Sequence, residues 1–142
     1  MEKMIMVKVY SVFVSHSWDH SDDLINLHSL LNKRGYFYHD SQEVTKDNPI
    51  NSKNEIYIKR RLRELIRNSN ILLALAGIYA SHSEWMSWEI ETAKELGIPI
   101  VGIIPRGQER ISKVVSDNSI EDIHWNTESI IQAIRNYAKW QE

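Results

Sequence analysis

The sequence predicts an α/β protein built on an open, doubly wound parallel sheet. Three apolar runs, rich in β-branched residues and without polar alternation, are typical of strands covered on both faces: residues 9–14, 71–77 and 98–104. Amphipathic helical patterns separate these runs. Alternation of strands and helices along a chain favours a parallel sheet with right-handed crossovers.

The first half of the chain supplies two strands and two helices in order. After the run at residues 9–14, leucines three and four residues apart predict a helix that ends near Gly35. A short run at residues 36–39 predicts the second strand. The second helix is marked by Ile58, Leu62, Leu65 and Ile66. The polar stretch between them, residues 40–54, is long for a connection in a compact domain and predicts a loop that covers a site.

The second half continues the pattern. The stretch at residues 81–99 predicts a helix between the third and fourth strands, residues 123–125 predict a brief fifth strand, and the last helix runs from an N-cap at about Thr127 to Trp140. The expected sheet is five-stranded with the flavodoxin-like order 2-1-3-4-5, in one domain spanning residues 1–142. A ligand would then bind beyond the carboxyl ends of strands one and three, where the strand order reverses.

Composition excludes several classes of function. The chain has 142 residues, 42% of them hydrophobic and 25% charged, and a net charge of -2 gives no reason to expect nucleic acid or a membrane as partner. The absence of cysteine excludes disulfides and thiolate chemistry. No apolar run has the length of a signal peptide or membrane span, so a cytoplasmic location is expected.

Known phosphate-binding motifs are absent from the sequence. Neither a GxxxxGK[ST] loop nor a GxGxxG turn occurs. The first strand is followed by "SHSWD", which contains no glycine, and several aspartates follow it. A phosphate placed on the start of the first helix would be repelled by these carboxylates, so a nucleotide would need other contacts.

Glu89 interrupts the apolar face of the helix that follows the third strand. At roughly 100° per residue its direction falls between Trp85 and Ala93, within the apolar arc. A structural interpretation is a buried ion pair with Lys94 or with an arginine of the "KRRLR" segment at residues 59–63. A functional interpretation is a carboxylate that stabilises a developing cation or holds sugar hydroxyls, as in glycosidic-bond cleavage. Desolvation would raise the pKa of this carboxyl group in either case.

Other polar residues meet at the same edge of the expected sheet. Ser15, His16 and Ser17 follow the first strand, and Asp40 follows the second. His16 and His20 are four residues apart, but the sequence offers no third ligand, so no metal site is predicted.

Several separated segments resemble the TIR-like proteins of the bacterial Thoeris antiphage system: "VFVSHSW", the segment "SNILLALAGIYASHSEWMSWEIETAKELGIPIVGIIPRGQER" and "WNTESIIQAIR". TIR domains that cleave NAD+ carry an S-x-W-x-x-x-E pattern on the helix after the third strand. Ser83, Trp85 and Glu89 match it, so the resemblance implies that Glu89 is the catalytic carboxylate. It also implies that Ser15, His16, Ser17, Asp40, Ser83 and Trp85 contact the substrate.

The resemblance implies an NAD+-cleaving enzyme that releases nicotinamide and makes a cyclic ADP-ribose isomer, which a separate effector protein senses. NAD+ would be the substrate, with no further cofactor, and homo-oligomers would form on activation. The family's phosphate-contacting arginine has no counterpart in "SHSWDH". Two alternatives stay open: a noncatalytic TIR interaction module, and an enzyme that resembles nucleoside deoxyribosyltransferases.

Overall fold

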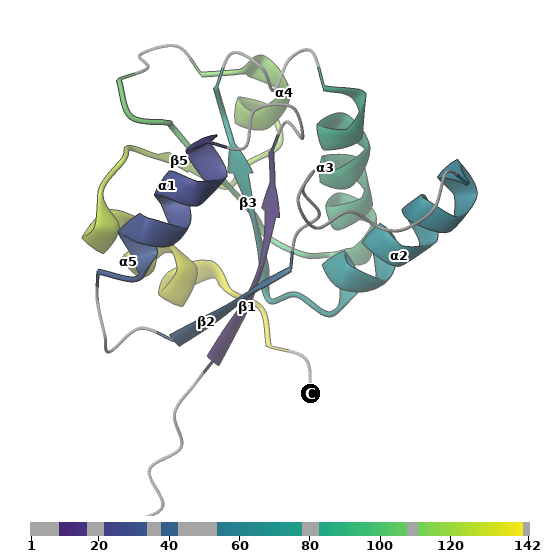
Figure 1. Ribbon diagram of the computed structural model, residues 1–142, viewed down its shortest axis with the longest axis horizontal. Helices are drawn as coiled ribbons and strands as arrows, with labels where there is room; N and C mark the ends of the chain where they lie inside the picture. Colours follow the sequence, from purple (N-terminus) through teal and green to yellow (C-terminus); the bar gives the residue numbers. More distant parts are fainter. Residues whose placement is uncertain are drawn as a thin grey trace, which may run out of the picture.

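The computed structural model describes residues 9–16, 22–33, 38–42, 54–77, 83–107 and 111–140. Strands and helices alternate along the chain (Figure 1). The strands are β1 (Val9–Ser15), β2 (Tyr38–Gln42), β3 (Ile71–Leu75), β4 (Ile100–Ile103) and β5 (Glu121–Ile123). The helices are α1 (Asp22–Leu31), α2 (Glu55–Arg67), α3 (Glu84–Leu96), α4 (Lys113–Ser116) and α5 (Thr127–Tyr137).

The five strands form one sheet in the order β2-β1-β3-β4-β5, and every neighbouring pair is parallel. The predicted α/β class with a parallel sheet is therefore confirmed. The order along the sheet reverses between β1 and β3. In the register of this pair Ser15, the last residue of β1, lies opposite Ala74, so both backbones reach their carboxyl ends together.

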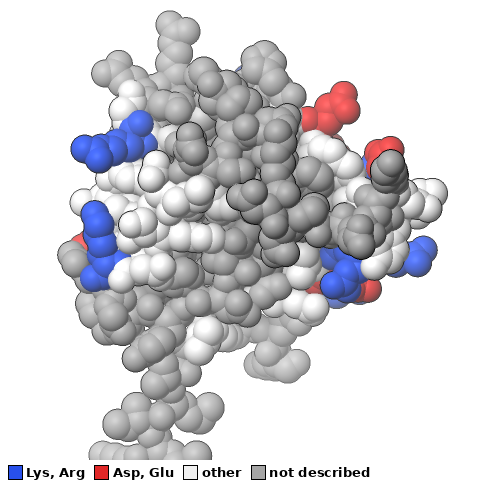
Figure 2. Space-filling view, in the orientation of Figure 1, with Lys and Arg blue, Asp and Glu red and all other residues white. Residues whose placement is uncertain are grey.

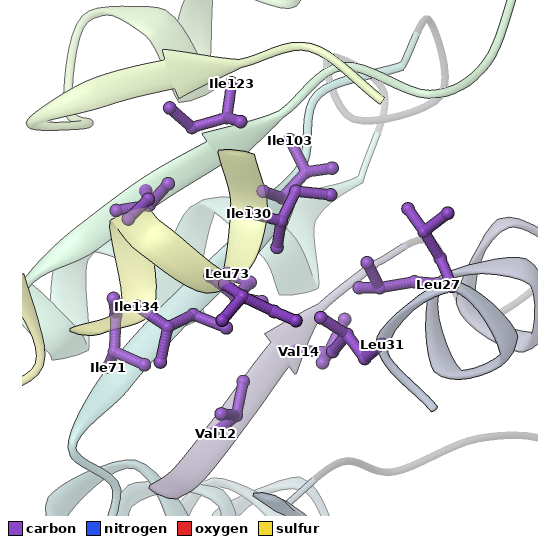
Figure 3. Close-up of a cluster of buried hydrophobic side chains, with 14 of the residues drawn as sticks. Val12, Val14, Leu27, Leu31, Ile71, Leu73, Ile103, Ile123, Ile130 and Ile134 are labelled. Atoms are coloured by element: carbon purple, nitrogen blue, oxygen red, sulfur yellow. The ribbon is translucent and has the colours of Figure 1, made fainter. Parts of the chain in front are cut away.

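Two hydrophobic clusters cover the two faces of the sheet. The first contains alternate residues of β1 and β3 packed against α1 and α5 (Figure 3), among them Val12, Val14, Leu27, Leu73 and Ile130. The second contains the intervening strand residues packed against α2 and α3, among them Phe13, Leu62, Leu72, Met86 and Ile90. Strand side chains point alternately to opposite faces, so both clusters need apolar residues from the same strand. This double burial explains the uninterrupted apolar runs.

Some boundaries differ from the sequence-based expectation. β2 begins at Tyr38 and continues to Gln42, so Asp40 lies within a strand where a loop was expected. Asn54, expected in the same loop, is the N-cap of α2. Residues 43–53 lie outside the described residues.

The last helix is capped one residue earlier than predicted. The side chain of Asn126, rather than that of Thr127, accepts the backbone N–H of Ser129, at 2.9 Å. Thr127 is the first helical residue, and its hydroxyl donates to the carbonyl of Leu30 at 3.2 Å, joining α5 to α1. A polar side chain that meets a partner 97 residues away cannot be told from a local cap by sequence alone.

Candidate active site

Glu89 and Ser15 form a buried hydrogen-bonded pair where the strand order reverses. The Ser15 hydroxyl donates to Glu89 Oε1 at 2.7 Å. Glu89 is 2% exposed and Ser15 is fully buried. Ser15 ends β1 beside β3, the position at which open parallel sheets bind ligands. The structure thus joins two of the predicted site residues through a direct contact.

Strand alternation orients Ser15 toward α3. Phe13 lies two residues earlier and packs in the second cluster, between β1 and the helices α2 and α3, so Ser15 shares its face of the strand. Met86, Ile90 and Ala93 anchor α3 on this face, whereas Glu91, Lys94 and Glu95 are exposed. Glu89 comes between Met86 and Ile90 in the sequence and is buried with them.

The ends of α3 are defined by two local motifs. The Ser83 hydroxyl accepts the backbone N–H of Met86 at 3.2 Å and caps the first turn. Gly97 ends the helix in a left-handed conformation, with φ 73°. Both motifs fix where the helix that carries Glu89 begins and ends. Ser83, predicted to contact substrate, has a capping role in this structure.

Burial raises the pKa of Glu89 from 4.5 to about 8. Removal from water disfavours the charged form, and this effect is larger than the opposing effect of the Ser15 hydrogen bond, which stabilises the carboxylate. Near neutral pH the group therefore holds a proton in most molecules. Strongly shifted carboxyl groups are more frequent at functional sites than elsewhere.

The proposed ion pair of Glu89 with a nearby basic residue is not formed. Within the described part of the chain, Glu89 bonds to Ser15 and to no cationic side chain. Three of the candidate basic residues have other partners. Arg61 pairs with Glu64, Arg63 pairs with Glu95, and Lys94 donates to Asn118. A buried carboxyl group without a cation lacks the usual structural compensation.

His16 is buried beside the pair, at the end of β1. It is 1% exposed, and its Nδ1 lies 3.4 Å from the carbonyl oxygen of Val14. Ser17 lies outside the described residues. The backbone of Asp40 is opposite Ser11 in the β1–β2 register, four residues before Ser15 along β1.

Trp85 belongs to an aromatic cluster between α2 and α3. It meets Trp88 edge to face, with ring centroids 6.3 Å apart. The Lys59 ammonium lies 5.9 Å from the centre of the Trp85 ring and 5.8 Å from that of Trp88, within cation–π range. A hollow of about 340 Å³ opens here, lined by Glu55, Ile58, Lys59, Glu84, Trp85 and Trp88.

Two residues near these elements had no predicted role. The aromatic partners of Lys59 lie 26 and 29 residues further along the chain, and no local pattern links them to it. Ser112 has a buried hydroxyl that forms no hydrogen bond in the described part of the structure, while its N–H donates to the carbonyl of Ala76 just after β3. No sequence signal distinguishes it from other serines.

Two further observations concern metal binding and membrane-spanning helices. Across the described ranges, no group of three histidine, aspartate or glutamate side chains is placed to hold a metal ion. No helix within those ranges combines the length and apolar character needed to cross a bilayer.

The fold and the buried acid define a doubly wound α/β protein with its candidate site at the strand reversal. The family model described as "Thoeris protein ThsB, TIR-like domain" matches residues 13–110. The chain therefore belongs to the Thoeris TIR-like family, which associates it with antiviral defence. No curated protein sequence matches it.

Three solved structures share the fold at low sequence identity. A 2-deoxyribosyltransferase from Bacillus psychrosaccharolyticus has 14% identity and a TM-score of 0.59, over 93% of this chain and 99% of that one. A putative pilus assembly-related protein from Burkholderia pseudomallei has 13% identity and a TM-score of 0.58, over 99% and 98%. The CMP N-glycosidase BcmB from Clostridium botulinum has 15% identity and a TM-score of 0.51, over 88% and 98%.

Proposed function

We propose that the protein cleaves NAD+ between nicotinamide and ribose, with Glu89 as the catalytic carboxyl group. The observation that carries the proposal is the buried Ser15–Glu89 pair at the reversal of strand order, with no cation beside it among the described residues. Membership of the Thoeris TIR-like family supports it, as does the match of Ser83, Trp85 and Glu89 to the family's pattern. The nearby cation would come from the substrate.

The charge of the substrate suits this acid. The nicotinamide nitrogen of NAD+ is positively charged. Attraction between this charge and the Glu89 carboxylate would offset part of the free-energy cost of ionising a buried group. As the C–N bond breaks, its electron pair moves to the nicotinamide nitrogen and the ribose carbon becomes cation-like. The Glu89 carboxylate would stabilise this charge, with Ser15 holding the carboxylate in place.

The second half of the reaction sets the product. Attack by water on the ribose carbon would give ADP-ribose and release a proton. Attack by a nucleophile of the same molecule would give a cyclic ADP-ribose isomer, again with loss of the nucleophile's proton. We favour the cyclic product, acting as a cytoplasmic signal for a separate effector protein, with assembly of several copies as the activating step. NAD+ serves as substrate, and no separate cofactor is invoked.

Two alternatives make different use of the same pair. In a noncatalytic interaction module, Glu89 would be a structural residue. In a nucleoside deoxyribosyltransferase-like enzyme, a carboxylate on a related fold would act on free nucleosides. Two of the solved structures that share the fold are named a 2-deoxyribosyltransferase and a CMP N-glycosidase, and they are the reason to test this second alternative.

The deciding experiment compares wild type, Glu89→Gln and Glu91→Gln. Glu91 lies on the exposed side of the same helix and is a matched control. Each protein is expressed in cells with and without phage infection and is also purified and incubated with NAD+ or nucleosides, and products are resolved by liquid chromatography and mass spectrometry. We expect nicotinamide release and a cyclic product in wild type and Glu91→Gln, and neither in Glu89→Gln.

Other results select the alternatives. Intact NAD+ with wild type in infected cells and in solution, with all three proteins folded, would favour the interaction module. Preferential consumption of nucleosides over NAD+ would favour the transferase.

A further inference from the structure

A second hollow lies beside α1, between this helix and the residues that follow β4 and β5. Its volume is about 540 Å³, within the range of small-molecule sites. Its lining comes from three separate parts of the chain: Asn26, Ser29, Leu30, Lys33, Arg106, Gly107 and Trp125. Neither the TIR pattern nor the Ser15–Glu89 pair involves any of these residues.

Two basic side chains, Lys33 and Arg106, line this hollow. Lys33 and Arg106 are exposed, and across the described ranges neither side chain forms an ion pair or a hydrogen bond. In Figure 2, basic side chains stand at the left edge, on the side where α1 lies in Figure 1. Most described basic residues of α2 differ, since Lys59, Arg61 and Arg63 pair with carboxylates. Among the residues that the structure describes, the positive charge of this hollow has no acidic counterpart.

The rest of the lining offers stacking and hydrogen bonding. Trp125 is half-buried, because it packs against the cluster of α1 and α5 while also lining the hollow. Asn26 and Ser29 provide an amide and a hydroxyl on the exposed side of α1. An indole ring beside two cations suits a ligand with a planar base and an anionic phosphate. We propose that this hollow is a binding site for a phosphorylated nucleotide.

The site is distinct from the one that contains Glu89. Leu30 belongs to the cluster on the α1 and α5 face of the sheet, whereas Glu89 is buried on α3, which covers the other face. The proposal does not depend on NAD+ cleavage. A ligand held here would bridge α1 to the residues that follow β4 and β5.

The test is calorimetric titration of the full chain carrying Glu89→Gln, so that no ligand is consumed. The probes are AMP, adenosine and inorganic phosphate. In this background we compare Lys33→Gln and Arg106→Gln with Arg60→Gln, which removes one exposed charge from α2. We expect AMP to bind, and each hollow variant to weaken its binding about tenfold, the scale of one charge-assisted contact. Arg60→Gln should leave the affinity for AMP unchanged.

The other probes separate a nucleotide site from a general anion site. Adenosine and phosphate should each bind more weakly than AMP, and Trp125→Leu should weaken AMP binding without affecting phosphate. Thermal melting of each variant checks that it is folded. The proposal is wrong if AMP does not bind, if Arg60→Gln weakens binding as much as Arg106→Gln, or if phosphate or adenosine binds as tightly as AMP. None of these outcomes bears on Glu89.

Discussion

The ionisation of Glu89 couples the candidate site to folding stability. The pKa of this group is about 8 in the folded chain, against 4.5 without burial. Between these values the folded protein holds a proton that the unfolded chain has released. The free energy of unfolding therefore falls as the pH rises through this window, and it is insensitive to Glu89 above it. Glu89 thus destabilises the fold under the conditions in which its charge would be useful.

Replacement of Glu89 by glutamine should make the protein more stable. Glutamine has a similar shape and can accept the Ser15 hydrogen bond, but it never carries the buried charge. The gain in free energy of unfolding should be small near pH 4.5 and should grow to the order of a few kcal/mol near pH 8. Urea titrations across this range measure it, with Glu91→Gln as the control. A constant difference between Glu89→Gln and wild type at all pH values would contradict the shifted pKa.

If Glu89 is the catalytic group, Ser15 would be its positioning residue, and removal of the Ser15 hydroxyl should change the pH dependence of activity. Its hydrogen bond lowers the pKa of the carboxyl group, so Ser15→Ala should raise that pKa further. If the carboxylate is the active form, kcat/KM for NAD+ rises with pH through about 8 in wild type, and the rise shifts to higher pH in Ser15→Ala. Loss of activity without a shift of the profile would assign Ser15 another role.

At the scale of the element, α3 depends on how it begins and ends. The Ser83 cap and the left-handed Gly97 fix its length, and the apolar residues between them fix which side faces the sheet. Glu89 is buried as a consequence of this phase. A substitution at either end of α3 can therefore alter the position of Glu89 in the candidate site.

Gly97→Ala tests the end of α3. An alanine at φ 73° carries the strain of the left-handed region, about 1–2 kcal/mol, and its added Cβ would lie 3.3 Å from the Lys139 ammonium nitrogen. We expect a corresponding loss in the free energy of unfolding, measured by urea denaturation. Glu91→Ala, an exposed change in the same helix, should alter it by about 0.5 kcal/mol or less. Equal stabilities of the two variants would contradict the role of Gly97.

Most helices and strands could be predicted because their patterns are local. The apolar runs at residues 71–77 and 98–104 enclose β3 and β4, and the phase of α3 predicted the burial of Glu89. The second strand was predicted at residues 36–39, because the polar residues Asp40, Ser41 and Gln42 are typical of a loop. In the structure these three residues belong to β2 and pair with β1. Neither the Lys59–tryptophan contacts nor the hydrogen bond from Ser15 to Glu89 could be predicted, since each joins distant parts of the chain.

At the scale of the whole molecule, Asn70 joins the end of the chain to the centre of the sheet. Its side chain accepts the Ser11 N–H at 2.8 Å and donates to the Lys139 carbonyl at 3.0 Å. Its backbone donates to Ser11 and accepts from Lys139, at 2.7 and 2.8 Å. One residue before β3 therefore connects β1 to the segment after α5.

Asn70→Ala should destabilise the molecule as a unit. It removes both side-chain hydrogen bonds and leaves the Ser11 N–H without its acceptor, at a cost of about 1–3 kcal/mol. Hydrogen exchange should show faster opening of the segment around Lys139 together with the loss in global stability. Asn136→Ala, which removes an exposed bond to Gln132, is the matched control and should change little. Unchanged exchange near Lys139 would contradict the connection.

The position of β1 between two later strands has a consequence for synthesis. This strand leaves the ribosome first, yet β3 must follow before its second edge is paired. Ser15 gains its hydrogen-bond partner later still, because Glu89 is synthesised 74 residues after it, a delay of about 4–15 s at ordinary rates of translation. Before Glu89 is synthesised, the Ser15 hydroxyl lacks the carboxyl group to which it donates in the folded protein. A chain whose synthesis stops before Glu89 therefore lacks the buried pair altogether, and with it any reaction that depends on the pair.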